Sequence, residues 1–451
     1  MSAIPGDVDA DRQPPMTVPL RHFLVASAFL PLGAVAGLAA VADFRLGLLS
    51  LAHAHLLLVG WVCLTIAGAM TQFVPVWSGV DLHSNRLAAL QLPLIAGGLV
   101  GFAAGLLAGR LALLPAFGAA MLLGFWVFVY NIGRTLARAR PFDTTERHFA
   151  LALGFFLLAT LLGLLLAVGF ARPSMLPAPR PAVVGAHATL AVFGAVLTTV
   201  LGALYQLGTM FTQTELHGID VPLGRFEEFG YPAGVLLLAG GRLAESATVA
   251  RAGGVLVALA LVAFAVVLAR RLWETQVERT PMLSRYAVVA VTTALWAALA
   301  LPAWLADPLT RPALLGRPGV SHLLLLGVVG FVVLGTVYHV VPFVVWVHRY
   351  SDRLGYEPVP MVDDLYNDRL AATDFWCFLA GTALLVADGL LGLPWLVPAV
   401  GGVAVLAGTL LFVVNVAGVV REHAPQSLLA VLLGTWAAVE SDGASASPDR
   451  D

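Results

Sequence analysis

The chain contains no lysine and only two cysteines, and 12% of its residues are charged. All 25 residues in the Lys plus Arg count are therefore arginine, which excludes a lysine Schiff base and any proton path through a lysine. Cys63 and Cys377 lie in apolar stretches and match neither a disulfide framework nor a zinc motif, so we interpret both as packing residues. No nucleic-acid-binding or phosphate-binding motif is present, and we expect no nucleic-acid partner.

The composition is typical of a protein embedded in a lipid bilayer. Hydrophobic residues make up 59% of the chain and the mean hydropathy is +0.88. Apolar stretches of the roughly 20 residues needed to cross a bilayer occur about twelve times. We therefore expect one transmembrane domain over 21–420, between an N-terminal tail (1–20) and a C-terminal tail (421–451). The expected spans are 21–43, 51–77, 87–108, 111–136, 148–171, 182–211, 229–245, 251–272, 284–306, 319–347, 371–391 and 394–420.

Two features of this pattern set the expected topology. The seventh span is the weakest, because Arg242 and Glu245 interrupt it. Arginines are more numerous on the side that holds both termini than on the opposite side, so the positive-inside rule predicts a multi-pass protein of the cell membrane with both termini in the cytoplasm. No cleavable signal peptide is evident, since residues 1–20 are polar and the first apolar run is long enough to span.

One helical pattern occurs three times along the chain. The copies read HAHLLLVGWVCLTIAGAMTQFVPVW from His53, HATLAVFGAVLTTVLGALYQLGTMF from His187 and VSHLLLLGVVGFVVLGTVYHVVPFVVW from Val320. Their first residues lie 134 and 133 residues apart, and these offsets also align three glycines and three polar residues: Gly68, Gly202 and Gly335, then Thr71, Tyr205 and Tyr338. We therefore predict three repeats of four helices, in which equivalent positions build equivalent sites.

Four histidines in this pattern are the candidate site residues: His53, His55, His187 and His322. Histidine inside a membrane helix is rare and usually functional. Residues two apart on a helix point about 200° away from each other, so His53 and His55 face different neighbours. Neutral imidazole is a common axial ligand of haem iron, and a haem between two helices takes one histidine from each. Copper binding by these histidines is a lesser alternative. In a purely structural alternative, each buried histidine only forms a hydrogen bond with a backbone carbonyl.

These motifs carry a resemblance to a known superfamily. A chain of three times four spans with His-x-His, then glycines, then a proline 20 residues after the second histidine resembles subunit I of the haem–copper oxidases. The segment HAHLLLVGWVCLTIAGAMTQFVPVWSG is similar to the NnrS-like branch, whose haem proteins are linked to nitric oxide. The resemblance covers most of 20–420 at the level of architecture. It implies an all-α integral membrane protein that binds haem b and works with a redox partner or an accessory subunit.

Carried over residue by residue, the resemblance implies a partial set of sites. His53 and His322 match the two ligands of the low-spin haem. The ligand of the oxygen-binding haem is replaced by Val320. His187 matches one copper ligand, but the other two copper ligands and the tyrosine one turn later (here Ala191) are absent. We therefore expect no complete oxygen-reducing centre.

The repeat suggests a second haem site. If the second-position histidine of one repeat pairs with the first-position histidine of the next, His55 pairs with His187 as His322 pairs with His53. The third pair would be Thr189 and Val320, neither of which ligates iron as an imidazole does. We hypothesise two bis-histidine haems, with a single haem at His53 and His322 as the alternative.

Other functions are left open by the sequence. Bis-histidine iron has no open position, so we expect electron transfer or nitric-oxide-related haem chemistry rather than oxygen chemistry, and the sequence leaves open whether the chain is an enzyme. A divergent terminal oxidase or nitric oxide reductase would need three metal ligands near the sixth and tenth helices, where only His187 and His339 are found besides the expected haem ligand His322. A cofactor-free transporter on the same scaffold would need buried carboxylates, and Asp388 is the nearest candidate. His339, with Tyr338, could contact a quinone or an ion, and the loop 349–370 has no assigned role.

Overall fold

The computed structural model describes residues 14–433; the remainder of the two predicted tails, 1–13 and 434–451, lies outside the described residues. Within the described range all long elements are helices. Eleven helical stretches are long and apolar enough to cross a membrane, which confirms the predicted all-α, multi-span class. They are α1 (Thr17–Val41), Leu49–Ser78, α4 (Asn85–Leu107), Leu111–Leu136, α6 (Thr144–Ala171), Arg180–Thr212, α10 (Ala247–Trp273), α11 (Pro281–Ala306), Leu323–Arg349, α13 (Asp368–Leu391) and α14 (Leu396–His423).

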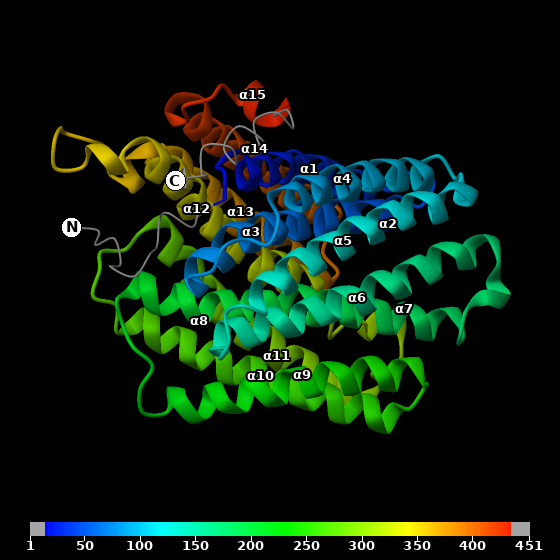
Figure 1. Cartoon of the computed structure of the whole chain (residues 1–451). Helices are drawn as coiled ribbons and strands as arrows, with labels where there is room; N and C mark the ends of the chain where they lie inside the picture. Colours follow the sequence, from blue (N-terminus) through cyan, green and yellow to red (C-terminus); the bar gives the residue numbers. More distant parts are fainter. Residues whose placement is uncertain (1–13, 434–451) are drawn as a thin grey trace.

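The expected seventh span differs from the other eleven. All but its last two residues lie in α9 (Asp220–Leu243), which is long enough to cross a membrane but too polar to meet the same criterion. Its buried residues include Glu227, Glu228 and Arg242. α9 packs along α10 in the lower layer of the molecule (Figure 1). Its polar side chains therefore depend on partners inside the bundle, described below.

Polar caps explain where several spans begin. Ser84 caps α4, and Asp143 with Glu146 forms a reciprocal capping box at the start of α6. Thr280 caps α11, and Asn367 accepts two backbone N–H groups at the start of α13. These side chains satisfy N–H groups that a helix leaves without partners in its first turn. The helices therefore begin a few residues before the apolar runs that predict them, and α1 begins inside the predicted N-terminal tail.

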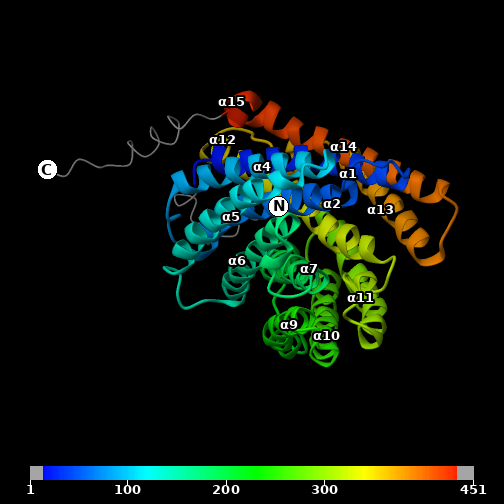
Figure 2. The ribbon, with the colours of Figure 1, turned by 90° about the vertical axis from the view of Figure 1, so that its right-hand side faces the viewer.

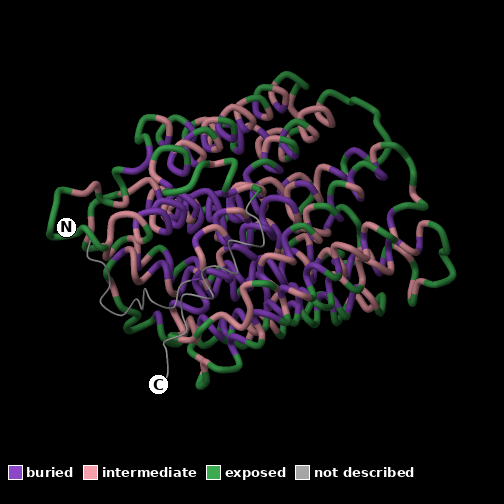
Figure 3. Tube along the Cα trace, turned by 45° about the horizontal axis from the view of Figure 1, so that its top comes forward, coloured by how far each residue is buried: buried purple, intermediate pink, exposed green. Residues whose placement is uncertain are grey.

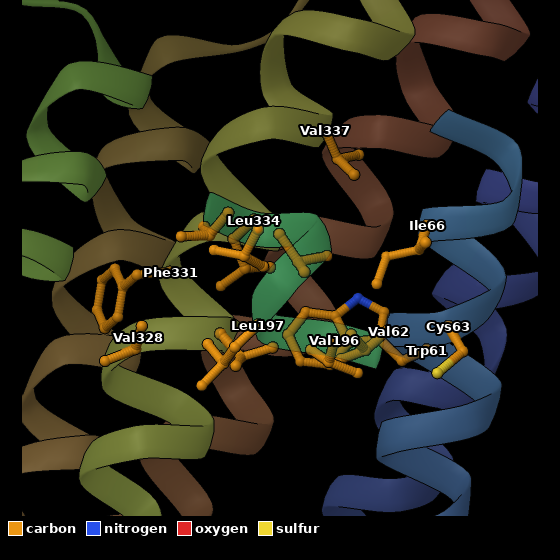
Figure 4. Packing of buried hydrophobic residues seen from close by; sticks show 14 of the residues in the cluster. Trp61, Val62, Cys63, Ile66, Val196, Leu197, Val328, Phe331, Leu334 and Val337 are labelled. Carbon is orange, nitrogen blue, oxygen red and sulfur yellow. The ribbon is translucent and has the colours of Figure 1, made fainter. Parts of the chain in front are cut away.

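Three stretches form the centre of the bundle. They are Leu49–Ser78, Arg180–Thr212 and Leu323–Arg349, and they are the most deeply buried spans (Figure 3). Apolar side chains from all three meet in the interior, among them Trp61, Val196 and Phe331 (Figure 4). α6, α9 and α10 pack around the second of these stretches, Arg180–Thr212, on one side of the bundle (Figure 2). The three stretches that carry the repeated sequence pattern are thus also the core.

Each central stretch contains an eight-residue π-helix. These are η2 (Leu56–Cys63), η5 (Leu190–Leu197) and η7 (Leu323–Gly330), and their first residues lie 134 and 133 residues apart. These are the same offsets that align the sequence copies. π-Helical turns are rare and frequently mark functional sites. Here each begins directly after the column that holds His55, Thr189 and His322.

Close approach between helices depends on glycine at several crossings. At the crossing of α9 and α10, a Cβ on Gly253 would lie 2.2 Å from the backbone nitrogen of Leu238. By contrast, a Cβ on Gly97 in α4 would meet no atom within 4 Å. In a membrane, where burial of apolar area gives no driving force between helices, this close packing is a main source of helix association.

We expect Gly253→Ala to lower the midpoint of thermal unfolding in detergent, because the added methyl group forces α9 and α10 apart. Overpacking of this kind costs about 1–3 kcal/mol. Gly97→Ala is the matched control, and its higher helix propensity should leave the midpoint unchanged or slightly raised. Equal midpoints for the two variants would show that the α9–α10 contact does not limit stability.

Candidate functional site

His53 is held by the helix that precedes it in the chain. It lies in α2 (Leu49–His55), and its Nδ1 is 2.8 Å from the carbonyl oxygen of Gly33 in α1. Nδ1–H therefore donates to the carbonyl, and Nε2 keeps its lone pair. One turn along α1, Gly37 faces the ring, and a Cβ there would lie 2.6 Å from Cε1 of His53. The missing side chain at Gly37 thus leaves room for the imidazole of His53.

His187 is held in the same way in the next segment. It lies in α7 (Arg180–Thr189), and its Nδ1 is 2.9 Å from the carbonyl oxygen of Ala159 in α6. A Cβ on Gly163, one turn along α6, would lie 3.0 Å from Cε1 of His187. A carbonyl oxygen on the preceding helix therefore orients each first-position histidine through Nδ1, and a glycine on that helix leaves room for the ring. Nε2 takes no part in this hydrogen bond.

The other two histidines sit at the second position of the pattern. Nδ1 of His55 is 2.8 Å from the carbonyl oxygen of Leu51 in its own helix, and the ring packs on Phe102 with 5.2 Å between centroids. His322 directly precedes η7, and its ring makes no hydrogen bond to another described residue. Among the four rings, His55 lies within electrostatic range of His187, and His53 lies within electrostatic range of His322, which also has Asp388 in range. These neighbours are the two pairs predicted from the repeat; ligation itself stays a prediction.

The donor set fits an axially ligated haem. Nε2 of His53, His55 and His187 has no hydrogen-bond partner within the described residues, while Nδ1 is fixed by a carbonyl. A metal-bound histidine usually has this arrangement, because the bond on one nitrogen fixes the tautomer and directs the other at the metal. Within residues 14–433, no group of three or more His, Cys, Asp or Glu side chains is placed to hold a metal ion. The imidazoles are arranged in pairs, and ligation of iron by these pairs stays a prediction.

Two other histidines in the same bundle provide an internal comparison. His22 donates through Nδ1 to the Val18 carbonyl, and its Nε2 accepts from the Gln91 amide at 3.1 Å. His148 bonds the Thr144 carbonyl at 2.7 Å and the Glu227 carboxyl at 3.1 Å. Both rings are 1% exposed and use both nitrogens. The candidate ligands use at most one ring nitrogen, and they are partly rather than fully buried.

The position without a histidine pair is occupied by protein side chains. Thr189 accepts a hydrogen bond of 2.6 Å from the guanidinium of Arg242, which is 3% exposed. The same guanidinium donates to the carbonyl oxygens of Pro308 and Ala313 and lies over the ring of Trp304. This arginine, which interrupts the predicted seventh span, thus has partners for three of its nitrogens.

Sequence reasoning missed a set of buried polar contacts near the far end of the central helices. The aligned glycines each face a polar residue of a neighbouring helix, and a Cβ there would lie 2.5–3.2 Å from that residue's Cβ. The three pairs are Gly68 with His22, Gly202 with His148 and Gly335 with Arg285. The sequence offsets align the glycines, but the partners follow different spacings, so the pattern in one helix could not find them.

Each of these polar residues bonds a side chain from a third helix. His22 bonds Gln91 in α4, His148 bonds Glu227 in α9, and Arg285 forms an ion pair with Asp374 in α13. All six side chains are at most 1% exposed. Two of the three aligned polar residues join these contacts: Gln91 donates to Thr71, and Tyr338 donates to Asp374. The three segments thus share one arrangement with different chemistry.

Comparison with known proteins adds no identity, since no family model and no curated protein matches the chain.

We expect Arg285→Met to destabilise the protein by about 3–5 kcal/mol, because it leaves Asp374 buried without its cation. The double variant Arg285→Met/Asp374→Leu should recover most of this loss, since it removes both charges. Thermal unfolding in detergent measures both. A single variant as stable as the parent would show that Asp374 finds another partner.

Proposed function

We propose that this chain is a haem-binding protein of the cell membrane with two bis-histidine sites. His53 and His322 hold one haem b, and His55 and His187 hold the other. The observation that carries the proposal is the pairing of half-satisfied histidines: the four rings form two neighbouring pairs, and three of them have Nδ1 fixed and Nε2 without a partner. Unpaired imidazole in hydrocarbon is disfavoured, so a ligand on Nε2 accounts for the arrangement.

The residues of this chain position the two groups side by side. His53 and His55 lie two residues apart and face opposite flanks of one helix, so that a single helix separates the sites. The carbonyls of Gly33 and Ala159 keep the first-position rings in one tautomer and orientation. Haem bound in this way supplies one-electron chemistry, and two axial imidazoles leave no open position. Electron transfer, or nitric-oxide-related chemistry that needs no complete binuclear centre, is the function that this arrangement favours.

The proposal includes the architecture that the sequence resembles. Three four-helix repeats on a haem–copper oxidase subunit I-like scaffold, nearest the NnrS-like branch, account for three π-helices at spacings of 134 and 133 residues and for three similar buried polar contacts. The uneven arginine distribution supports cytoplasmic termini, with the four histidines near the outer face. A redox partner or accessory subunit would deliver the electrons.

One observation favours a transporter as the second candidate. Carboxylates are buried inside the bundle, and Glu227 is fully buried beside His148. Buried ionisable residues in membrane helices often mark ion or proton paths. Asp374, in contrast, is paired with Arg285, whereas Asp388 lies within electrostatic range of His322.

Haem content of histidine variants tests the proposal. His55→Ala and His322→Ala should each reduce the haem-to-protein ratio from two to one, because each removes an axial ligand from a different site. His83→Ala, in a loop outside the four, should retain both haems. The ratio is measured by the pyridine haemochrome assay on protein purified from a haem-replete host. Loss of both haems from one folded single variant would refute the pairing, and no haem in the parent would favour the transporter.

A further inference from the structure

A pocket lies where the three central helices end, away from the paired histidines. Its volume is about 690 Å³, and it is lined by the ends of α3 (Leu64–Ser78), α8 (Thr198–Thr212) and α12 (Phe331–Arg349). These ends lie at one side of the molecule (Figure 1). His339 in this pocket follows His322 by 17 residues, about 25 Å along a helix at 1.5 Å per residue. The pocket is therefore separate from the proposed haem sites.

Aromatic rings form much of the pocket wall. They are Phe73, Trp77, Phe211, Tyr338, Phe343, Trp346 and Tyr366. His339 lies among them, with its ring centroid 4.2 Å from Phe211 and 6.0 Å from Phe343. Its imidazole makes no hydrogen bond to any other residue in the described range. The wall thus combines π faces with one hydrogen-bonding group that has no protein partner.

The pocket is predominantly acidic. Its charged lining residues are Glu278, Asp363, Asp364 and Asp368, against Arg279 alone. No ion pair between described residues involves any of these four carboxylates. Partial burial, together with the charges of Asp364 and Asp368, raises the pKa of the Asp363 carboxyl. The acidic residues belong to the segments 276–282 and 362–368, so the loop 349–370 contributes to this pocket.

We propose that the pocket binds a protonated amine that carries an aromatic or apolar body. The ammonium group would be attracted to the carboxylates and donate to His339, and the apolar body would pack on the rings. Aromatic faces attract cations, and a carboxylate-lined pocket selects against anions. The volume lies within the range of small-molecule sites. A neutral quinone would leave the acidic charge uncompensated, which is why the amine is favoured.

Three ligands of similar size but different charge test this assignment. They are 2-phenylethylamine, the neutral 2-phenylethanol and the anionic 3-phenylpropionate, with the full chain in nanodiscs of zwitterionic lipid. Equilibrium dialysis measures binding, and tryptophan fluorescence reports occupancy through Trp77 and Trp346. We expect the amine to bind at least tenfold more tightly than the alcohol and the carboxylate not to bind. Equal affinities, or displacement of the amine by a water-soluble benzoquinone that binds more tightly, would overturn the proposal.

Variants locate the binding to this pocket. Asp363→Asn and His339→Phe should each weaken the amine about tenfold or more, because each removes one acceptor while keeping a side chain of similar size. Asp352→Asn changes a carboxylate of the same loop that does not line the pocket, and it should bind as the parent does. Unchanged affinity in both pocket variants, with normal elution on size exclusion, would refute the site. Neither result depends on haem content, so this proposal and the proposed function can fail separately.

The pH dependence of amine binding follows from Asp363. Because its pKa is raised, the carboxyl becomes protonated at a higher pH than an ordinary aspartate. Affinity should therefore fall on acidification through that raised pKa, before ordinary aspartates are protonated. Dialysis across a pH series measures the effect. Asp352→Asn should retain this fall, whereas in Asp363→Asn it should shift to lower pH, and an identical profile in the parent and Asp363→Asn would contradict the role of Asp363.

Discussion

The requirement that polar groups inside a membrane find partners within the bundle governs this structure. Water is absent from hydrocarbon, so an unsatisfied polar group costs several kcal/mol there. Arg242 meets the requirement with two carbonyls and a hydroxyl, and Arg285 with two carbonyls and the Asp374 carboxylate. Glycines such as Gly335 bring the helices close enough for these bonds to form. In the central helices, close packing at glycines therefore makes the hydrogen bonds of the buried polar groups possible.

The same requirement distinguishes two classes of histidine. His22 and His148 bond through both ring nitrogens to groups of the bundle. His53 and His187 bond through one and approach a second-position histidine instead. The first class needs no further ligand, whereas the second is arranged like axial ligands in pairs. At the third pair of positions, where Thr189 and Val320 stand in place of histidines, Arg242 bonds Thr189.

Sequence alone predicted the elements well and the contacts poorly. Hydropathy located eleven spans within a few residues, because apolar length is read directly from the chain. Hydropathy also counted part of α9 as a membrane span, although α9 is more polar than the other spans and its polar residues bond groups of other helices. The π-helices had no sequence signal, and the partners of the aligned glycines follow spacings unlike those of the glycines themselves. His339 and the loop 349–370 each stood out in the sequence, but only folding joins them in one pocket.

The central claim is that paired histidines bind two haems without an open coordination position. The most direct measurement is the reduced-minus-oxidised visible spectrum of the purified parent protein, with haem quantified per chain and with carbon monoxide added to the reduced form. The account predicts two low-spin b-type haems per chain and no spectral shift with carbon monoxide. Absence of haem from a haem-replete preparation, or a carbon monoxide shift that reveals an open iron position, would contradict it.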